Sequence, residues 1–263
     1  MEAPLDLQYL TRTFGVTGRT ALVTGSSTGI GLAIAEALGR SGARVIVNAR
    51  HGDRCADAAA RLRAQGIEAL SVPFDVTDAQ AVSEAFGRLG SDEVGVDLLV
   101  SNAGVQDRQP VVDMSPESWQ SLQDVHVKGA FHCVRAALPG MVTRSFGRIV
   151  LMSSVAARAA VPNICGYATA KGALAAFARA LAVEYGERGI TVNALAPGFV
   201  RTEFTAALQA NADFAEFLGR SVPLHRWGTV EEIAPAVVFL CSAAGAFVTG
   251  HSLTIDGGLL AHL

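Results

Sequence analysis

Three polar side chains in one stretch of the sequence have the types and spacing of a proton-transfer site. Tyr167 follows Ser154 by thirteen residues, and Lys171 follows Tyr167 by four. Because an alanine-rich run comes next, we expect Tyr167 and Lys171 on one helix, one turn apart on the same face. A free tyrosine has a pKa near ~10, and a nearby cation favours the phenolate and lowers that pKa. The Ser154 hydroxyl could hold a carbonyl or alcohol oxygen facing the phenol.

A glycine-rich turn earlier in the chain could hold a nucleotide. Gly25, Gly29 and Gly31 follow the apolar run Thr20-Ala-Leu-Val23 and open a helical pattern. Glycines allow a tight turn and a close backbone approach to a pyrophosphate, whose charge the helix N-terminus favours. The spacing is G-x-x-x-G-x-G, unlike the G-x-G-x-x-G of many dehydrogenases. A tight turn without a ligand is the alternative, which the strand–turn–helix context disfavours.

The residues after the second and third predicted strands bear on the choice of nucleotide. An acidic residue after the second strand would bind the ribose 2′-hydroxyl of NAD. The sequence there is Asn-Ala-Arg-His over 48–51, and Arg50 could pair with a 2′-phosphate, which favours NADP(H) over NAD(H). A solvated arginine is the alternative. Asp75 and Val76 could face the adenine, although the aspartate could equally cap a turn.

The elements that must position these groups alternate along the chain. Short β-branched apolar runs and helical patterns follow one another about seven times. Such runs, apolar on both faces, are typical of a parallel sheet covered by helices on both sides. The predicted strands are residues 20–23, 44–48, 69–72, 97–101, 148–152, 190–195 and 252–255. We therefore predict the α/β class, a single doubly wound domain with a mostly parallel seven-stranded sheet.

Three further segments complete this prediction. Residues 1–17 are expected to form an N-terminal leader before the domain, which spans 18–263. One long helix is predicted over about 116–144. The segment 203–220 is too long for an ordinary turn and follows a strand at the carboxyl edge, where ligands bind in such folds. We expect residues of about 201–224 to form a mobile lid over the substrate.

Composition excludes several classes of protein. The chain has 263 residues, half of them hydrophobic, which is enough to bury a large core. With a net charge of −3 and no long basic run, a nucleic-acid partner is not expected. No apolar run reaches the ~18 residues of a membrane span, and the N-terminus does not resemble a signal peptide. The four separated cysteines fit a reduced cytoplasmic protein, and the histidine spacings match no common zinc site.

Taken together, these motifs resemble the short-chain dehydrogenase/reductase family over about residues 18–258. The glycine turn, Ser154 and Tyr167-x-x-x-Lys171 carry the resemblance, with Asn-Ala-Gly at 102–104 and Pro-Gly at 197–198. It implies a Rossmann fold, a homotetramer, and hydride transfer between NADP(H) and a small ketone or secondary alcohol. By this resemblance Tyr167 is the general acid/base and Ser154 polarises the carbonyl. Lys171 would lower the pKa of Tyr167 and bind the nicotinamide ribose.

The resemblance also implies a set of cofactor contacts. Thr202 resembles the residue that holds the carboxamide or phosphate of the cofactor. The expected cofactor-binding residues are Gly25, Ser27, Thr28, Gly29, Ile30, Gly31, Arg50, Asp75, Val76, Asn102, Ala103, Gly104, Tyr167, Lys171, Pro197, Gly198, Val200 and Thr202.

Two positions depart from the family pattern; at one of them, Ser101, the family often has an asparagine, and the change is expected to be mild. In the long helix before the fifth strand the family commonly has an asparagine, which anchors a water on the proton path to the lysine. The matching residue here is His126. An imidazole could also hold that water, which would keep a catalytic relay with an altered pH dependence. Alternatively, His126 only packs within the helix and the relay is weakened.

Several local stretches resemble gluconate 5-dehydrogenases and 3-oxoacyl-carrier-protein reductases, namely residues 102–110, 202–208 and 225–228. The substrate is therefore expected to be a sugar acid, a polyol or another small carbonyl compound, with a 3-oxoacyl thioester as the alternative. Arg108 and Gln106 could meet a carboxylated substrate or lie in a solvated loop. A rival of another class is a catalytically weak nucleotide sensor or structural subunit, which the His126 departure motivates.

Overall fold

A computed structural model describes residues 6–91 and 94–261 of the chain. Seven strands form one sheet in the order β3-β2-β1-β4-β5-β6-β7, and every neighbouring pair is parallel. They are β1 Thr20–Val23, β2 Arg44–Val47, β3 Ala69–Ser71, β4 Leu98–Ser101, β5 Gly147–Met152, β6 Ile190–Pro197 and β7 Ser252–Ile255. The predicted doubly wound α/β fold is confirmed.

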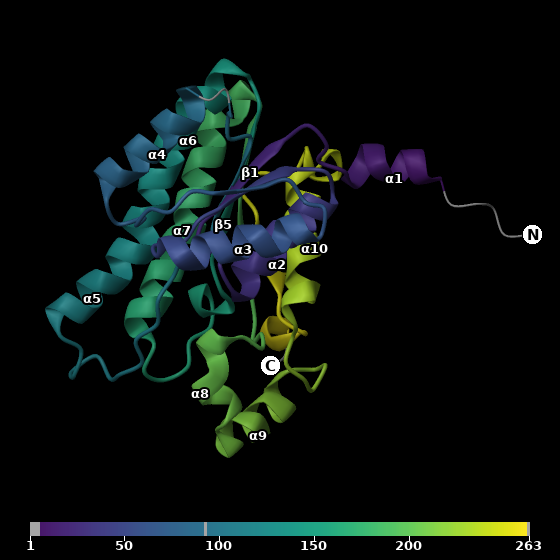
Figure 1. The fold of residues 1–263 in the computed structure, drawn as a ribbon. Helices are drawn as coiled ribbons and strands as arrows, with labels where there is room; N and C mark the ends of the chain where they lie inside the picture. Colours follow the sequence, from purple (N-terminus) through teal and green to yellow (C-terminus); the bar gives the residue numbers. More distant parts are fainter. Residues whose placement is uncertain (1–5, 92–93, 262–263) are drawn as a thin grey trace, which may run out of the picture.

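Helices cover both faces of the sheet, each set over its own apolar core (Figure 1). On one face lie α2 (Gly29–Arg40), α3 (Gly52–Ala64) and α10 (Val230–Cys241). On the other lie α4 (Ala79–Ser91), α6 (Gly129–Thr143) and α7 (Cys165–Tyr185). Within β1, Ala21 and Val23 belong to the first core and Leu22 to the second. The strand is apolar from Ala21 to Val23 because successive side chains point to opposite buried faces.

The order of the strands places a crevice between β1 and β4. The chain builds outward from β1 to β3 and then crosses back, so that β1 pairs with both β2 and β4. In open parallel sheets, ligands bind at the carboxyl ends of the strands where the order reverses. The segments that follow β1, β4 and β5 therefore meet at one place, and they carry the glycine turn, Asn102 and Ser154.

The long helix predicted over 116–144 contains a π-helical turn. α5 (Pro116–Gln123) runs into η1 (Asp124–Lys128), and α6 follows directly. The sequence pattern predicted a single regular helix and did not predict this turn. π-Helical turns within α-helices are rare and are frequently found at functional sites. The one here carries His126, whose side chain is buried.

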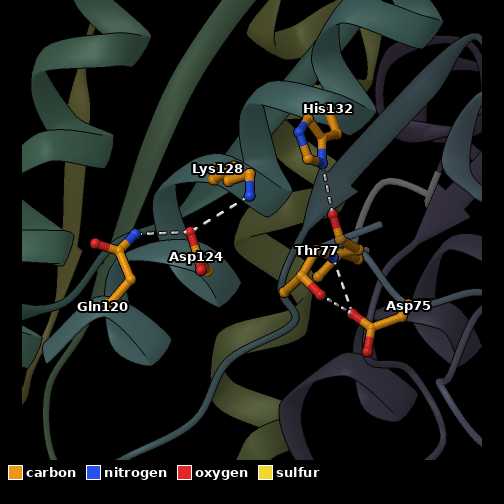
Figure 2. Close-up of polar contacts among 7 residues, drawn as sticks. Asp75, Thr77, Gln120, Asp124, Lys128 and His132 are labelled. Carbon is orange, nitrogen blue, oxygen red and sulfur yellow. Dashed lines mark hydrogen bonds and ion pairs between the residues drawn. The ribbon is translucent and has the colours of Figure 1, made fainter. Parts of the chain in front are cut away.

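Side-chain contacts on the outer surface span the π-helical turn. Asp124 accepts a hydrogen bond from Gln120 Nε2 at 2.9 Å and forms an ion pair with Lys128 Nζ at 3.6 Å (Figure 2). The two partners lie four residues before and four residues after Asp124. Side-chain contacts therefore continue along the outer face of the helix across the π-helical turn. On the inner face, the side chain of His126 contacts Val105 and Tyr167.

Residues 6–17 include a short helix, α1 (Leu7–Phe14), that the sequence pattern did not predict. Asp6 caps it by accepting a hydrogen bond from Tyr9 N at 2.9 Å. None of its residues is buried, and α1 stands away from the body of the sheet (Figure 1). The first five residues of the expected leader lie outside the described residues, as do 262–263 at the end of the domain.

The segment expected to form a lid folds into three short helices: η4 (Glu203–Thr205), α8 (Ala206–Gln209) and α9 (Ala212–Ser221). They have their own small core of Leu218, Val222 and Trp227, separate from the two cores of the sheet. The short 3-10 helices elsewhere are η2 Val155–Ala157, η3 Gly186–Arg188, η5 Ala243–Gly245 and η6 Leu259–Ala261. Within the described ranges, no helix has the length and apolarity needed to cross a membrane.

Candidate active site

The turn after β1 has a shape that only glycine fits at two positions. Gly25 has a φ of 62°, and a Cβ there would lie 2.8 Å from the Cα of Ala103. A Cβ on Gly31 would lie 2.4 Å from the carbonyl oxygen of Gly25. The turn therefore packs directly against the segment after β4, an approach that a side chain would prevent.

The N-terminus of α2 faces the same space. Thr28 is its N-cap residue, and within the described chain its side chain makes no capping hydrogen bond. The first N–H groups of a helix have no partner inside the helix, and the helix dipole favours an anion beside them. A glycine cradle that ends on such a helix terminus fits the pyrophosphate of a dinucleotide.

Two asparagines brace the turn from neighbouring strands. Asn102 Nδ2 donates to the carbonyl oxygens of Thr24 at 3.0 Å and Gly25 at 3.1 Å. Asn48 Oδ1 accepts from Gly25 N at 3.4 Å, and Nδ2 donates to the Phe74 carbonyl at 3.2 Å. The sequence analysis predicted Asn102 as a cofactor contact; it lines the cleft, and its side-chain nitrogen also holds the turn. The bracing role of Asn48 was missed, although a polar residue ending an apolar strand could have indicated it.

Basic side chains line the cleft beyond the end of β2. Arg50 lies there as expected, together with His51 and Arg54, which the sequence analysis did not single out. No carboxylate occupies the end of β2, since the strand is followed by Asn48, Ala49 and Arg50. This end of the cleft thus offers cations where an NAD-specific site would offer an acid.

Asp75 and Val76 line the cleft next to this basic end. Asp75 Oδ1 accepts hydrogen bonds from Thr77 N at 2.9 Å and Thr77 Oγ1 at 2.8 Å (Figure 2). One carboxylate oxygen of Asp75 therefore caps the turn, as the alternative expected, while the residue also borders the cleft. His132 Nδ1 lies 3.0 Å from the Val76 carbonyl oxygen and ties this loop to α6 (Figure 2).

The three groups that opened the sequence analysis come together at the other end of the cleft. Tyr167 and Lys171 lie one turn apart on α7, with Lys171 Nζ 5.3 Å from the centroid of the phenol ring. Lys171 is buried and donates to the Met152 carbonyl at 2.6 Å. Ser154 precedes η2, where its Oγ accepts from Ala156 N at 3.1 Å, and its hydroxyl also hydrogen-bonds to Tyr167. The arrangement can hold an oxygen atom between a hydroxyl and a phenol.

Burial controls the protonation of this group. It raises the pKa of Tyr167, and the hydrogen bond from Ser154 and the charge of Arg108 oppose this rise only in part. It also lowers the pKa of Lys171 to about 7. The sequence analysis expected a lowered pKa for this phenol, but the pKa is raised because desolvation of the phenolate outweighs the groups that favour it. Tyr167 is protonated at neutral pH and can act as an acid.

His126 packs directly against Tyr167. Their ring centroids are 5.5 Å apart with an interplanar angle of 82°. His126 Nε2 lies 2.7 Å from the Val105 carbonyl oxygen, and a Cβ on Gly104 would lie 2.5 Å from His126 Cε1. Burial, followed by the charge of Lys171, lowers the pKa of His126 to about 3, so the ring is neutral at pH 7.

The two ring nitrogens of His126 differ in their surroundings. Nε2 lies 2.7 Å from the Val105 carbonyl oxygen and 3.3 Å from Val105 N, and the shorter contact assigns the proton to Nε2. Nδ1 is buried and is left without a hydrogen-bond partner among the described residues. A buried acceptor of this kind is expected to bind a water or a ligand group. The sequence analysis expected that the imidazole of His126 could hold a water, but it did not say which ring nitrogen would be buried without a partner.

One cleft of about 560 Å³ joins these parts. Arg108 and Gln106 lie at its edge, and the Gln106 carbonyl oxygen, in its hydrogen-bonding orientation, accepts from Arg108 Nε at 2.9 Å and Nη2 at 3.0 Å. The cleft is lined by all the residues predicted for the site: Gly25, Ser27, Thr28, Gly29, Ile30, Gly31, Arg50, Asp75, Val76, Asn102, Ala103, Gly104, His126, Ser154, Tyr167, Lys171, Pro197, Gly198, Val200 and Thr202.

Comparison with known proteins extends this geometry. A family model described as enoyl-(acyl carrier protein) reductase matches residues 25–260. Gluconate 5-dehydrogenase of Gluconobacter oxydans is 38% identical over 250 residues, which is 95% of this chain and 98% of that protein. The chain belongs to the short-chain dehydrogenase/reductase family. A 3-oxoacyl-[acyl-carrier-protein] reductase of Synechocystis is 36% identical over 247 residues, covering 93% of this chain and 98% of the relative.

Solved structures agree with this membership. The crystal structure of a gluconate 5-dehydrogenase from Burkholderia cenocepacia, in complex with NADP and tartrate, superposes with a TM-score of 0.94 at 37% identity. The match covers 96% of this chain and 99% of that one. The fold and family predicted from the motifs are confirmed. The chain is an oxidoreductase that uses a nicotinamide dinucleotide to interconvert a ketone and a secondary alcohol.

Proposed function

We propose that this protein is an NADPH-dependent carbonyl reductase in which Tyr167 is the proton donor. The observation that carries the proposal is a protonated, half-buried phenol, flanked by Ser154 and Lys171, at one end of a dinucleotide-shaped cleft. When bound, NADPH supplies a hydride to the carbonyl carbon. Tyr167 gives its proton to the carbonyl oxygen, while the Ser154 hydroxyl donates to that oxygen and stabilises the charge that develops on it.

The glycine turn and the N-terminus of α2 would hold the pyrophosphate, and Asp75 with Val76 would contact the adenine. At the nicotinamide end, Pro197, Gly198, Val200 and Thr202 line the cleft. Lys171 donates one of its three protons to the Met152 carbonyl, which leaves others for the nicotinamide ribose. These contacts would bring the nicotinamide of the cofactor beside Tyr167.

The preference for NADP(H) over NAD(H) is part of the proposal. Arg50 and Arg54 border the cleft where the 2′-phosphate of the adenine ribose would lie, and no acid ends β2. Arginine is suited to bidentate contact with a phosphate. The NADP in the Burkholderia cenocepacia structure supports the same choice.

His126 would act on proton supply. Its neutral ring presents the buried Nδ1 as an acceptor, and a water bound there could pass a proton toward Lys171. Replacing it in the variant His126→Asn and comparing pH–rate profiles tests this role. A shifted profile with unchanged NADPH affinity is expected, whereas an unchanged profile would show that the ring only packs.

Residues of about 201–224 are proposed as a lid over the substrate. They lie within the domain that we assign to residues 18–263. α8 and α9 share one small core, and Arg226, which follows the lid, donates to both carboxylate oxygens of Glu232 on α10 at 2.8 and 2.7 Å. The lid would therefore move as one piece. Faster proteolysis within 201–224 in the free enzyme than with NADPH and product bound would support this motion.

The substrate is proposed to be a small ketone that meets Arg108 at the edge of the cleft. The guanidinium lies close enough to interact with the Tyr167 phenol and could pair with an anionic substituent. The relationship to gluconate 5-dehydrogenases supports a sugar acid or polyol. The relationship to a 3-oxoacyl-[acyl-carrier-protein] reductase supports a thioester as the second candidate.

We also propose a cytoplasmic homotetramer. The four cysteines are free, which fits a reducing compartment, and the edge of β7 is a surface on which another subunit could pack. Sedimentation analysis of the purified protein tests the assembly, with a monomer at micromolar concentration as the contrary result.

A screen of NADPH oxidation with keto sugar acids, α-diketones, cyclic ketones and acetoacetyl-CoA tests the function as a whole. A reductase consumes NADPH only when one of these compounds is present and forms the corresponding alcohol. Tight NADPH binding without turnover on any of them would instead favour a nucleotide sensor or structural subunit.

A further inference from the structure

The end of the cleft beyond Tyr167 is walled mainly by apolar side chains. The first wall comes from the segments after β4 and β5 and consists of Val105, Val155, Ala156, Ala159, Ala160, Val161 and Ile164. The second wall comes from the lid and the C-terminal segment and consists of Phe204, Leu208, Phe217 and Leu259. A substrate whose carbonyl reaches Tyr167 must place the rest of its body between these walls.

Several of the polar groups near these walls are already used within the protein. Thr205 Oγ1 donates to the Val200 carbonyl at 2.8 Å and accepts from Thr202 N at 3.1 Å and Gln209 Nε2 at 2.9 Å. The carbonyl oxygen of Gln106 accepts from Arg108. Each hydroxyl of a sugar acid needs a partner when it leaves water. Beyond the pair that holds the reacting oxygen, the charged partners that line this end of the cleft are the remaining N–H groups of Arg108 and the carboxylate of Glu203.

Two aromatic rings of the lid are partly exposed beside the reacting phenol. The Phe204 ring centroid is 6.4 Å from that of Tyr167, and the side chain is 45% exposed. Phe217 is 36% exposed and lines the same space, while its ring packs 5.6 Å from Phe214 and 6.0 Å from Phe199. Phe217 is thus held in place by the small core of the lid, and a hydrophobic ligand that covers both rings would remove apolar surface from water.

We infer that the substrate is a ketone with a hydrophobic, ring-bearing body, which lies between Phe204 and Phe217 on one side and Val155 and Ile164 on the other. This inference rests on the proposed reductase function and narrows its substrate class away from polyhydroxylated sugar acids. In each turnover one ketone takes a hydride from NADPH at carbon and a proton through Tyr167 at oxygen. The products are one secondary alcohol and NADP⁺.

The test compares three ketones with NADPH and the intact wild-type enzyme. The probes are 4-phenylbutan-2-one, butan-2-one without the ring, and 5-keto-D-gluconate. We expect kcat/KM for 4-phenylbutan-2-one to exceed the other two values by about tenfold or more, because the walls bury the ring and leave sugar hydroxyls unpaired. Acetoacetyl-CoA serves as a fourth substrate for the thioester alternative.

Variants of the lid rings identify the source of that preference. Phe204→Ala and Phe217→Ala are expected to lower kcat/KM for 4-phenylbutan-2-one about tenfold while changing the value for butan-2-one much less. Phe14→Ala on α1 is the control, since Phe14 is 42% exposed but does not line the cleft. Phe204→Leu keeps an apolar side chain of similar bulk and should lose less than Phe204→Ala, which separates loss of contact from misfolding.

The outcomes distinguish this inference from the function beneath it. If 5-keto-D-gluconate or acetoacetyl-CoA is the better substrate, or if the lid variants affect all ketones equally, the inferred substrate class is wrong and the reductase function stands. If NADPH binds and no ketone is reduced, the proposed function fails as well.

Discussion

The two ends of the cleft are built in different ways. At the cofactor end, short polar side chains and backbone groups fix a turn that is continuous in sequence from Thr24 to Gly31. At the substrate end, the walls are apolar side chains from segments more than 100 residues apart, such as Val105 and Leu259. The cofactor end can therefore be identified from a local motif, whereas the substrate end exists only after the chain has folded.

The reacting group lies between the two ends and combines both kinds of construction. The spacing of Tyr167 and Lys171 is local, because it needs only one turn of α7. Their protonation depends on burial, which raises the pKa of the phenol and lowers that of the ammonium. The two ends should therefore respond differently to substitution.

Removing the phenolic hydroxyl should have the largest effect. The variant Tyr167→Phe is expected to lower kcat for ketone reduction about 10²–10⁴-fold, the usual contribution of a positioned acid. NADPH affinity, measured by the fluorescence of the bound cofactor, should change far less than kcat, because the glycine turn is untouched and the ring of residue 167 is kept. Full activity in this variant would remove Tyr167 from the mechanism.

Adding one methyl group to the glycine turn should break the cofactor end alone. In Gly31→Ala the new Cβ would meet the Gly25 oxygen at 2.4 Å and Asn102 Nδ2 at 2.5 Å. We expect NADPH affinity to fall about 100-fold, since the backbone must shift where the pyrophosphate binds. The control is Gly87→Ala on α4, where nothing lies within 4 Å of the new Cβ. Equal affinities in the two variants would mean that the cradle does not bind the cofactor.

Acid should destabilise the protein through His126. Its pKa is lowered to about 3 in the folded state, whereas the unfolded chain takes up the proton below about 6.5. Stability from this group is present above pH 6.5 and is lost as the pH falls toward 3. At pH 5 the loss amounts to up to about 2 kcal/mol relative to pH 7.

Urea unfolding of the wild type and of His126→Asn at both pH values measures this contribution. The asparagine variant, which cannot be protonated, should lose less stability between pH 7 and pH 5 than the wild type. Identical losses in the two proteins would show that His126 is charged, or accessible to water, in the folded state.

Removing one arginine at the adenosine end should have the smallest effect. Arg50→Ala is expected to weaken NADPH binding about tenfold, the worth of one charge-assisted contact, and to leave NADH binding nearly unchanged. Arg63→Ala, at the far end of α3 and outside the cleft, is the matched control. If both nucleotides weaken equally, Arg50 does not read the 2′-phosphate.

The sequence was sufficient for the features that depend on neighbouring residues. Strand positions followed from apolar runs such as 20–23, and the glycine turn followed from its place between a strand and a helix. The last strand, 252–255, has the predicted bounds. These features require only the local pattern of side chains and the two periods of regular structure.

The missed features depend on contacts between distant segments. The π-helical turn at 124–128 places His126 against Tyr167, which helical periodicity alone does not encode. The pKa of Tyr167 is raised because the folded chain around it desolvates the phenolate. The nearby Lys171 in the sequence therefore did not predict the direction of this shift. Asn48 braces the glycine turn from 23 residues away in sequence. The apolar walls of the cleft also come from segments that are distant in sequence.

The most direct test of the account is to follow the hydride itself from one end of the cleft to the other. NADPH deuterated at the transferable position of the nicotinamide is incubated with the wild-type enzyme and a ketone that it reduces. We predict one deuterium on the carbinol carbon of each alcohol formed, and no deuterium on that carbon when unlabelled NADPH is used in D₂O. Alcohol without deuterium from the labelled cofactor, or NADPH consumption without alcohol, would contradict hydride transfer in this cleft.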